Sequence, residues 1–395
     1  TMDLASFSDQ SDADYLAGSQ YQIGNFVTPQ FLGNLNFNDA SLFDISPDPS
    51  EFLGENYSAD ENIYGAYAMW NQNITENFSF LAGLRVEHTS LSYTGNEFED
   101  EETLLGEVNN DRSYTNVLPG LHLKYNPLGD LIFRAAWTNT LARPNYFDLV
   151  PFRDVRPGDE ELNLGNPNLD ATESMNFDFS VENYFESIGL VSASFFYKNV
   201  DNFIYAFVND DFTNDPAIPD GEEWTFTQAQ NGGSADVYGI ELSFQRQLDF
   251  LPGIWKGLGV YLNYTYTNSD ADGIRNEDGE LREGDFALPG TAPHTFNASL
   301  SFETKRLVIR SSVNFADSYL DELGGDSFSD RFYDHQFFLD INASYAIKPF
   351  LRVFFEATNL TDQPLRYYQG ISTRTMQEEY YGRRLTLGLK FDLFK

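Results

Sequence analysis

The stretch YGRRLTLGLKFDLFK, residues 381–395, decides the fold class. Its odd-numbered positions are apolar, and the even-numbered positions between them are polar or small; the apolar set is Leu385, Leu387, Leu389, Phe391 and Leu393. Alternation with a period of two is typical of a β-strand. The apolar face continues for about ten residues, which is the length that a tilted strand needs to cross the hydrocarbon core of a bilayer. The stretch therefore predicts a membrane-spanning strand with one face toward lipid.

The same alternation recurs from residue 58 to the C-terminus. The apolar faces fall at 64–70, 78–86, 121–125, 131–137, 175–181, 191–197, 238–244, 260–266, 296–302, 307–315, 337–345, 351–357 and 385–393. The opposite faces carry charged and amide side chains, such as Arg134, Asp178, Glu241 and Asp340. A dry core would not accept so many polar groups, so these faces must line a hydrated space. The pattern predicts an all-β protein, a transmembrane antiparallel β-barrel of which about thirteen strands are present.

The composition limits the other possibilities. Aromatic residues make up 16% of the chain, and Trp70, Trp137 and Trp255 fall near expected strand ends, as in the aromatic girdles of membrane barrels. No run of eighteen apolar residues could form a membrane helix, and there is no cysteine for a disulfide or a thiolate metal site. The net charge of −37 argues against nucleic acid as a partner.

The connections alternate between tight turns and long loops. Tight turns are expected at 126–130, 186–189, 303–306 and 348–349, and long loops at 95–112, 142–172, 206–228, 269–291, 317–331 and 363–380. This segregation is typical of outer-membrane barrels, with the short turns periplasmic and the long loops extracellular. Residues 1–57 show no sustained alternation and are interpreted as an extracellular loop region, and residues 58–395 as the C-terminal portion of the barrel. An odd strand count and the absence of a signal-peptide pattern lead us to expect that further strands precede this chain.

Several motifs carry a family resemblance. They read LARPNYFDLVPFR at 141–153, GNPNLDATESMNFDFSVENYF at 165–185, GLVSASFFYKNVDNFIY at 189–205 and NGGSADVYGIELSFQRQL at 231–248. Later segments, FFEATNLTDQPLRYY at 354–368 and GRRLTLGLKFDLF at 382–394, extend the match. Together they resemble the C-terminal barrel of TonB-dependent outer-membrane receptors. Two departures are DAT at 170–172, where the family usually has Lys-Pro-Glu, and Lys395 after the terminal aromatic residue.

The resemblance implies a receptor of the Gram-negative outer membrane with a barrel of about twenty-two strands and a plug domain that is absent from this chain. Its expected partners are the TonB-ExbB-ExbD system, acting through the plug, the lipid bilayer with lipopolysaccharide, the remaining strands and the plug itself. The implied function is active import of a scarce or large nutrient that the extracellular loops capture. Oligosaccharide is favoured over ferric siderophore as the ligand, and a passive porin-like diffusion channel is the alternative.

The candidate ligand contacts lie on the long loops and the upper lumen. They are Arg143, Tyr146, Phe147, Phe152, Arg153, Trp224, Tyr367, Tyr368 and Tyr380. Aromatic rings can stack on sugar faces, and arginines can bind carboxylates in a bidentate manner. The alternative is that these side chains only pack the loops together.

Two further kinds of chemistry were weighed. The loop SDADGIRNEDGELREG at 269–284 places Asp270, Asp272 and Asp278 at spacings that could bind a structural Ca²⁺, although the full EF-hand pattern is missing and no other cofactor is expected. The four histidines form no HExxH motif, and the chain has no cysteine nucleophile, so we do not expect an enzyme.

Overall fold

The computed structural model describes residues 10–11, 25–27, 29–36, 38–39, 41, 43, 49–100, 102–185, 188–276, 279–282 and 286–392. The chain divides into two units, Thr1–Asp48 and Pro49–Lys395. In the first unit, strand β1 (Gln10–Ser11) pairs with β2 (Asn25–Phe26), and helix α1 spans Pro29–Asn34. The second unit begins with the short helix α2 (Ser50–Leu53) and contains the main sheet. None of the described helices is long and apolar enough to cross a membrane.

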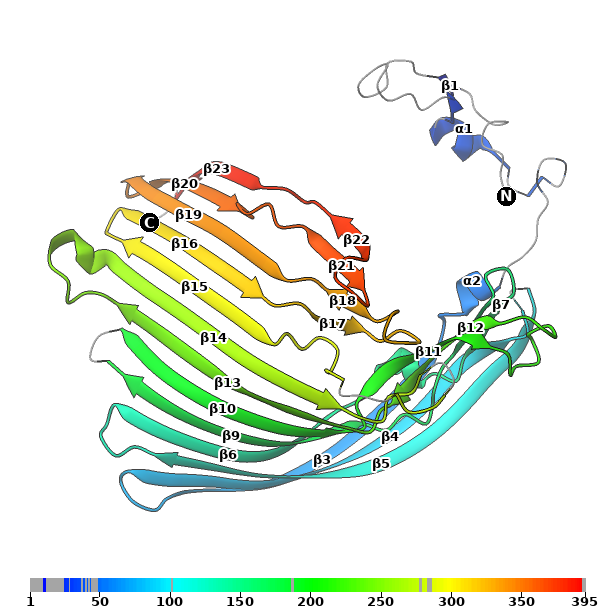
Figure 1. Ribbon diagram of the computed structural model, residues 1–395, viewed down its shortest axis with the longest axis horizontal. Helices are drawn as coiled ribbons and strands as arrows, with labels where there is room; N and C mark the ends of the chain where they lie inside the picture. The colour runs from blue at the N-terminus through cyan, green and yellow to red at the C-terminus, as the bar shows by residue number, and fades with distance from the viewer. Residues whose placement is uncertain are drawn as a thin grey trace. The chain divides into compact units, whose positions relative to one another are not determined.

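One antiparallel sheet forms most of the second unit (Figure 1). Its strands, in spatial order, are β3 (Ser58–Asn73), β4 (Phe78–Phe98), β5 (Leu104–Tyr125), β6 (Leu131–Ala142), β9 (Thr172–Tyr184), β10 (Gly189–Asp201), β13 (Ser234–Gln247), β14 (Leu258–Ala271), β15 (His294–Glu303), β16 (Leu307–Ala316), β19 (Gln336–Lys348), β20 (Leu351–Thr358) and β23 (Arg384–Phe391). These thirteen strands are the ones that the alternation predicts, and the fold-class prediction is confirmed. The sheet curves like a barrel wall, but in the described residues no pairing joins β3 to β23, so the wall stays open there.

The strand registers align the apolar faces into a continuous band. One row of paired residues runs Trp70, Ala82, Leu121, Trp137, Phe177, Tyr197 and Tyr238 across seven strands. On β23, Leu385, Leu387 and Leu389 are 65%, 76% and 59% exposed, so this face does not enter a dry protein core. A one-residue slip of any strand would turn its apolar set to the other side, so the hydrophobic pattern excludes slips by an odd number of residues.

The opposite face of the wall is polar. Asn263, Asn297 and Asn314 are paired in a row across β14, β15 and β16 on this face. Glu241 on β13 lies on the same face and is paired with Thr265, two residues from Asn263. Arg134 and Glu182 form an ion pair at 2.9 Å on this face. We refer to it as the lumenal face, because a barrel wall with an apolar outer band encloses its polar side.

The two ends of the wall differ. At one end the connections are tight, between β5 and β6, β9 and β10, β15 and β16, and β19 and β20, as predicted. The connection between β13 and β14 at the same end is longer and contains the 3-10 helix η3 (Gly253–Gly257) (Figure 1). We call this the short-turn end and the opposite one the long-loop end.

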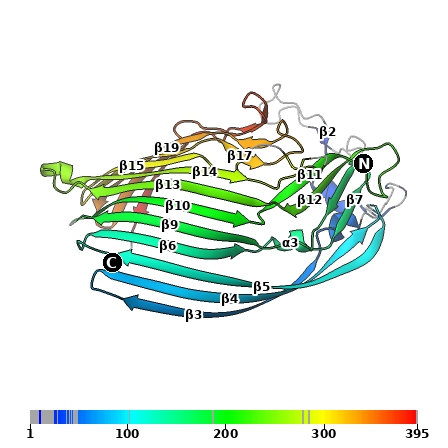
Figure 2. The same cartoon turned by 60° about the horizontal axis from the view of Figure 1, so that its bottom comes forward.

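The long-loop end contains strands that the sequence pattern did not predict. They are β7 (Arg153–Arg156), β8 (Glu161–Leu164), β11 (Ile204–Phe212) and β12 (Trp224–Asn231), and a separate four-stranded sheet of β17 (Tyr319–Glu322), β18 (Arg331–Tyr333), β21 (Leu365–Gln369) and β22 (Thr375–Glu379). Figure 2 shows β7, β11, β12 and β17 at the same end of the wall. A hydrophobic cluster that includes Val155, Phe207 and Leu320 packs these loops together.

The prediction of a long loop at 95–112 is wrong. β4 continues to Phe98 and β5 begins at Leu104, so the hairpin turn covers only a few residues. This part of the hairpin is rich in polar residues on both faces, which removes the alternation that marks the wall strands. The strands β5 and β6 pair only as far as Gly120 and Thr138, and beyond that point β5 is paired with β4 alone.

Candidate ligand-binding site

The segment after β6 places three of the predicted site residues. Pro144 cannot donate a ladder hydrogen bond, which suits the end of β6 at Ala142. Asn145 then caps helix α3 (Tyr146–Leu149), its side-chain oxygen accepting a hydrogen bond from the Phe147 backbone N–H at 3.4 Å. The cap and the short helix place Arg143, Tyr146 and Phe147 beside β3 and β4, at the long-loop end of these strands.

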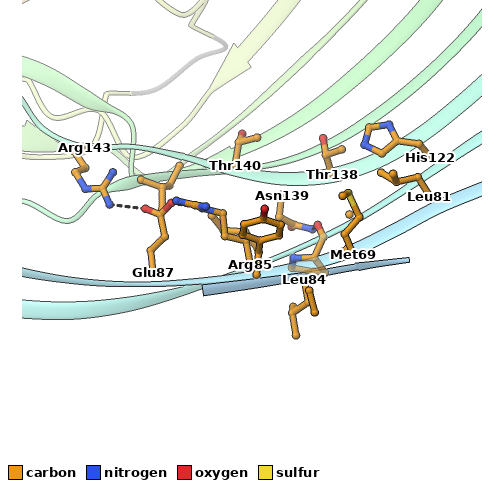
Figure 3. Close-up of a pocket in the computed structure, with 17 residues that line it drawn as sticks. Met69, Leu81, Leu84, Arg85, Glu87, His122, Thr138, Asn139, Thr140 and Arg143 are labelled. Atoms are coloured by element: carbon orange, nitrogen blue, oxygen red, sulfur yellow. Dashed lines mark hydrogen bonds and ion pairs between the residues drawn. The ribbon is translucent and has the colours of Figure 1, made fainter. Parts of the chain in front are cut away.

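Arg143 joins two carboxylates on neighbouring strands. Its guanidinium donates to Glu87 Oε2 at 2.6 Å (Figure 3). It also donates to Thr89 Oγ1 at 3.1 Å, and its Nε lies 3.7 Å from Glu61 Oε1. Arg85 reaches the other oxygen of Glu87 at 2.5 Å. Burial lowers the pKa of Arg143, but the hydrogen bond that it donates to Glu87 and the nearby negative charge outweigh burial, so its pKa is raised and it stays charged.

Tyr146 completes this charged group. Its hydroxyl donates to Glu61 Oε2 at 3.0 Å, and that bond raises the pKa of Tyr146, so the phenol remains a donor. Tyr93, which is buried nearby, and Tyr114 have hydroxyls without a hydrogen-bond partner in the described part of the chain. Buried polar groups are normally paired, so unpaired hydroxyls beside a charged cluster are donors that a bound polar molecule could use.

A pocket of about 610 Å³ lies on the lumenal face next to this group (Figure 3). Arg85, Glu87 and Arg143 line one side, and His122 and Thr138 line another. The pocket lies where β5 and β6 separate, because the ladder between them ends at the Gly120–Thr138 pair. It combines an apolar floor with a few converging charged groups, which is the usual composition of a ligand site.

A second pocket, of about 540 Å³, lies on the other side of helix α3. Phe147 and Phe152 stack in its wall with ring centroids 4.7 Å apart, and Tyr57 lies 6.0 Å from Phe147. Asp154 also lines this pocket, and its buried Oδ1 has no hydrogen-bond partner in the described residues. Burial raises the pKa of Asp148, which faces the same space.

The other predicted ligand residues are dispersed. Arg153 donates to the Phe98 carbonyl oxygen and to Asp215, both at 2.6 Å, and so ties loops together. Trp224 is 1% exposed inside the loop cluster, and Tyr368 stacks on Phe332 at 5.2 Å.

Tyr367 and Tyr380 lie in the remaining loops. Tyr367 packs against Tyr333 at 4.8 Å, and Tyr380 is exposed and donates to Glu378 at 3.1 Å. The structure therefore groups Arg143, Tyr146, Phe147 and Phe152, and gives Arg153, Trp224 and Tyr368 packing partners within the loops.

The predicted calcium ligands Asp270 and Asp272 have different surroundings. Asp270 is exposed and pairs in register with Asp236, whereas the Asp272 carboxylate accepts the Ser234 backbone N–H at 2.7 Å. Asp278 lies outside the described residues. Within the described ranges, no group of three metal-binding side chains is present, and the calcium site stays a prediction.

Sequence reasoning missed Glu61 and Tyr57 as members of the site. Tyr57 directly precedes β3 and Glu61 lies near its start, far along the chain from Phe147 and Arg143, and only the fold brings them together. Glu87 was recognisable as a polar side chain on an inward face, but its partner was not. The feature of the sequence that could have identified Glu87 is a carboxylate on the lumenal face of a wall strand, near the long-loop end.

Comparison with known proteins places the fold. A family model described as TonB dependent receptor-like, beta-barrel, matches residues 2–360. The ferric-catecholate import receptor Fiu from E. coli K12 is similar, with a TM-score of 0.62 and 15% sequence identity; the match covers 86% of this chain and 45% of that one. The copper transporter OprC has a TM-score of 0.60 and 16% sequence identity, and the match covers 89% of this chain and 50% of that one. The ferric yersiniabactin uptake receptor FyuA from Yersinia pestis has a TM-score of 0.59 and 16% sequence identity, and the match covers 86% of this chain and 46% of that one.

The chain spans about half the length of these solved receptors, and at such identities the likeness establishes the fold alone. No curated protein matches the chain in sequence. The family model, in contrast, covers most of the residues, including the whole wall from β3 to β20. This chain therefore belongs to the TonB-dependent receptor family, in the part that forms the β-barrel.

Proposed function

We propose that this chain forms the wall and the extracellular mouth of an outer-membrane receptor that imports a scarce or large nutrient. Family membership supports a transporter rather than an enzyme, and the apolar outer band supports a membrane position. Energy for import would come from TonB-ExbB-ExbD through a plug domain outside this chain. The long-loop end would then be extracellular and the short-turn end periplasmic.

The observation that carries the proposal is the group around Arg143. An arginine bound to Glu87 and Glu61, with unpaired tyrosine hydroxyls nearby, borders a pocket on the lumenal face. Ion pairs that only held the strands together would not require a pocket beside them, so the pocket favours a binding role for this group. The pocket lies toward the long-loop end of the wall strands, where a ligand caught by the loops would enter the lumen.

The ligand class that the site favours is a neutral oligosaccharide. The stacked rings of Phe147 and Phe152 offer a flat apolar surface, and Asp154 offers an unpaired acceptor in the same pocket. The net charge of −37 would repel an anionic ferric complex at long range. Ferric siderophore is the second candidate, because the solved receptors of similar fold include importers of ferric complexes.

Binding measurements test the ligand class. Purified full-length receptor in detergent is titrated with neutral oligosaccharides and with ferric siderophores. We expect saturable binding of an oligosaccharide, weakened about tenfold by Phe147→Ala or Phe152→Ala because the stacking surface is lost. Phe350→Ala, at the short-turn end, is the control and leaves binding unchanged. Binding of ferric complexes alone would overturn the oligosaccharide assignment and leave the receptor role standing.

Uptake measurements test the energy source. Cells that depend on this receptor are supplied with the bound ligand, with and without a proton uncoupler or a TonB deletion. Active import predicts that uptake against a gradient stops in both conditions. Unchanged uptake would favour the passive porin-like channel instead.

A further inference from the structure

The lysines of this acidic chain are unevenly distributed along the wall. All the described lysines except Lys198 lie at the short-turn end of the strands, namely Lys124, Lys256, Lys305, Lys348 and Lys390. Lys256, Lys305 and Lys348 are exposed on three turns that follow one another around the wall, between β13 and β14, β15 and β16, and β19 and β20. No ion pair in the described part of the chain includes any of these lysines.

Arg246 adds a cation on the outer face at the same end. Its register places it opposite Gly189 and Val260, in the rows that Val191, Phe244 and Leu262 continue on the apolar band. The guanidinium carbon lies 4.3 Å from the ring centroid of Phe185 and 4.7 Å from that of Phe250. Arg246 is thus held between two aromatic rings on a surface that faces lipid.

The strand geometry around Arg246 makes room for this arrangement. A Cβ added to Gly189 would lie 2.7 Å from the Phe185 ring and 3.3 Å from Arg246 Cγ. Glycine at this position therefore allows the Phe185 ring and the arginine stem to lie against the strand. The Arg246 Nε is buried, and within the described ranges it has no hydrogen-bond partner and this arginine takes part in no ion pair.

The adjacent turn carries side chains suited to the membrane interface. Phe250, Ile254 and Trp255 are large, apolar and exposed, and Lys256 follows Trp255 on η3. Aromatic rings next to a cation are typical of the level of the lipid headgroups. The patch is continuous with the apolar band, so its depth is that of the headgroups in the periplasmic leaflet.

We propose that Arg246 and Lys256, with the rings of Phe185, Phe250 and Trp255, bind the phosphodiester headgroup of an anionic phospholipid of the periplasmic leaflet. A guanidinium presents a planar fork of N–H donors that matches two phosphate oxygens. The two Phe rings hold that fork at a fixed orientation, and Lys256 adds a mobile second charge. The inference depends on the membrane position of the wall and is independent of the ligand that the receptor imports.

Native mass spectrometry of the full-length receptor tests this site. The protein is extracted from nanodiscs that contain phosphatidylglycerol and phosphatidylcholine, and the retained lipids are counted. We expect selective retention of phosphatidylglycerol, weakened about fivefold for each cation removed in Arg246→Gln and Lys256→Gln. Arg246→Lys should retain most of the selectivity, and Lys198→Gln, at the other end of the wall, should leave it unchanged.

Two results would overturn the proposal. One is equal retention of both lipids by the unmodified receptor, and the other is equal retention of phosphatidylglycerol by the receptor and its double Gln variant. Displacement of the lipid by inorganic phosphate alone would show a general anion site and would overturn the lipid assignment.

A second measurement does not require the double variant to fold. In a receptor whose other tryptophans are replaced by Phe, brominated phosphatidylglycerol should quench Trp255 more strongly than brominated phosphatidylcholine does. Equal quenching by the two lipids would contradict the proposal.

Discussion

Single residues on the lumenal face determine how closely the wall strands can pack. Gly239 on β13 lies opposite Phe196 on β10, and a Cβ added to it would overlap the Phe196 ring and the Tyr266 carbonyl oxygen. The ring of Phe196 thus covers a glycine on the neighbouring strand, as aromatic residues do elsewhere in sheets. Gly83 on β4 also faces the lumen, but an added Cβ there would meet its nearest atom at 3.6 Å, an ordinary contact.

These two glycines give a matched pair of substitutions. Gly239→Ala is expected to lower the free energy of unfolding by about 1–3 kcal/mol, because Phe196 and the β14 backbone must move. Gly83→Ala is expected to change it by much less. Urea titration of the receptor folded into liposomes measures both, and an equal effect of the two substitutions would contradict the explanation.

The residue scale is also where sequence reasoning was weakest. Arg143, Tyr146 and Phe147 were candidates because they are arginine and aromatic side chains on a predicted long loop. Their partners Glu61 and Glu87 are far along the chain and are joined to Arg143 only by the registers of β3 and β4. A period-two pattern gives the face on which each residue lies, but it does not say which residue of one strand is paired with which residue of the next.

At the scale of elements, the four-stranded sheet at the long-loop end has an acid-sensitive connection. Asp334 follows β18 and binds Arg366 on β21 at 2.5 Å, and its Oδ1 accepts the His335 backbone N–H at 2.9 Å. Burial raises the pKa of Asp334, but the bonds from Arg366 and His335 outweigh burial, so its pKa lies below the ordinary value of 3.8. A carboxyl with a depressed pKa stabilises the fold above its unfolded value and loses that contribution as the pH falls.

We therefore expect this sheet to loosen as the pH falls below about 3.8, through the lower pKa of folded Asp334. Asp334→Asn should destabilise the sheet at pH 7 and reduce its further loss in acid. The near-ultraviolet circular dichroism of Tyr319, Tyr333 and Tyr367, which pack on one another, reports the change. Asp362→Asn is the control, since Asp362 lies 4.0 Å from Arg383, a longer contact than the 2.5 Å between Asp334 and Arg366. The same acid profile in both variants would refute the role of Asp334.

The wall strands were predictable as elements, and the small strands at the long-loop end were not. The wall strands alternate because one face meets lipid and the other meets water. β17, β18, β21 and β22 form a separate sheet, in which Tyr319 and Tyr333 occupy one face and Leu320 and Phe332 the other. Both faces then contain large apolar or aromatic groups, so the period-two signal disappears and the segments read as loops.

For the whole molecule, the central prediction is a lipid-facing outer band. Leu242 lies in the middle of β13 on the apolar face, and its neighbour Glu241 faces the lumen. Leu242→Arg is expected to cost about 2–4 kcal/mol of folding free energy in liposomes, because a charge at the membrane midplane is poorly solvated. Glu241→Arg should cost much less, and equal costs measured by urea titration would argue against a membrane position for this face.

The β4–β5 hairpin has a consequence for receptors that are crowded together. Above Gly120, β5 is paired on one side only, so the backbone of residues 104–111 is available to a strand from another molecule. Glu107 and Asp111 point outward along this segment, and two such segments brought together would place like charges side by side. We therefore expect these charges to disfavour strand pairing between copies of this chain at the hairpin.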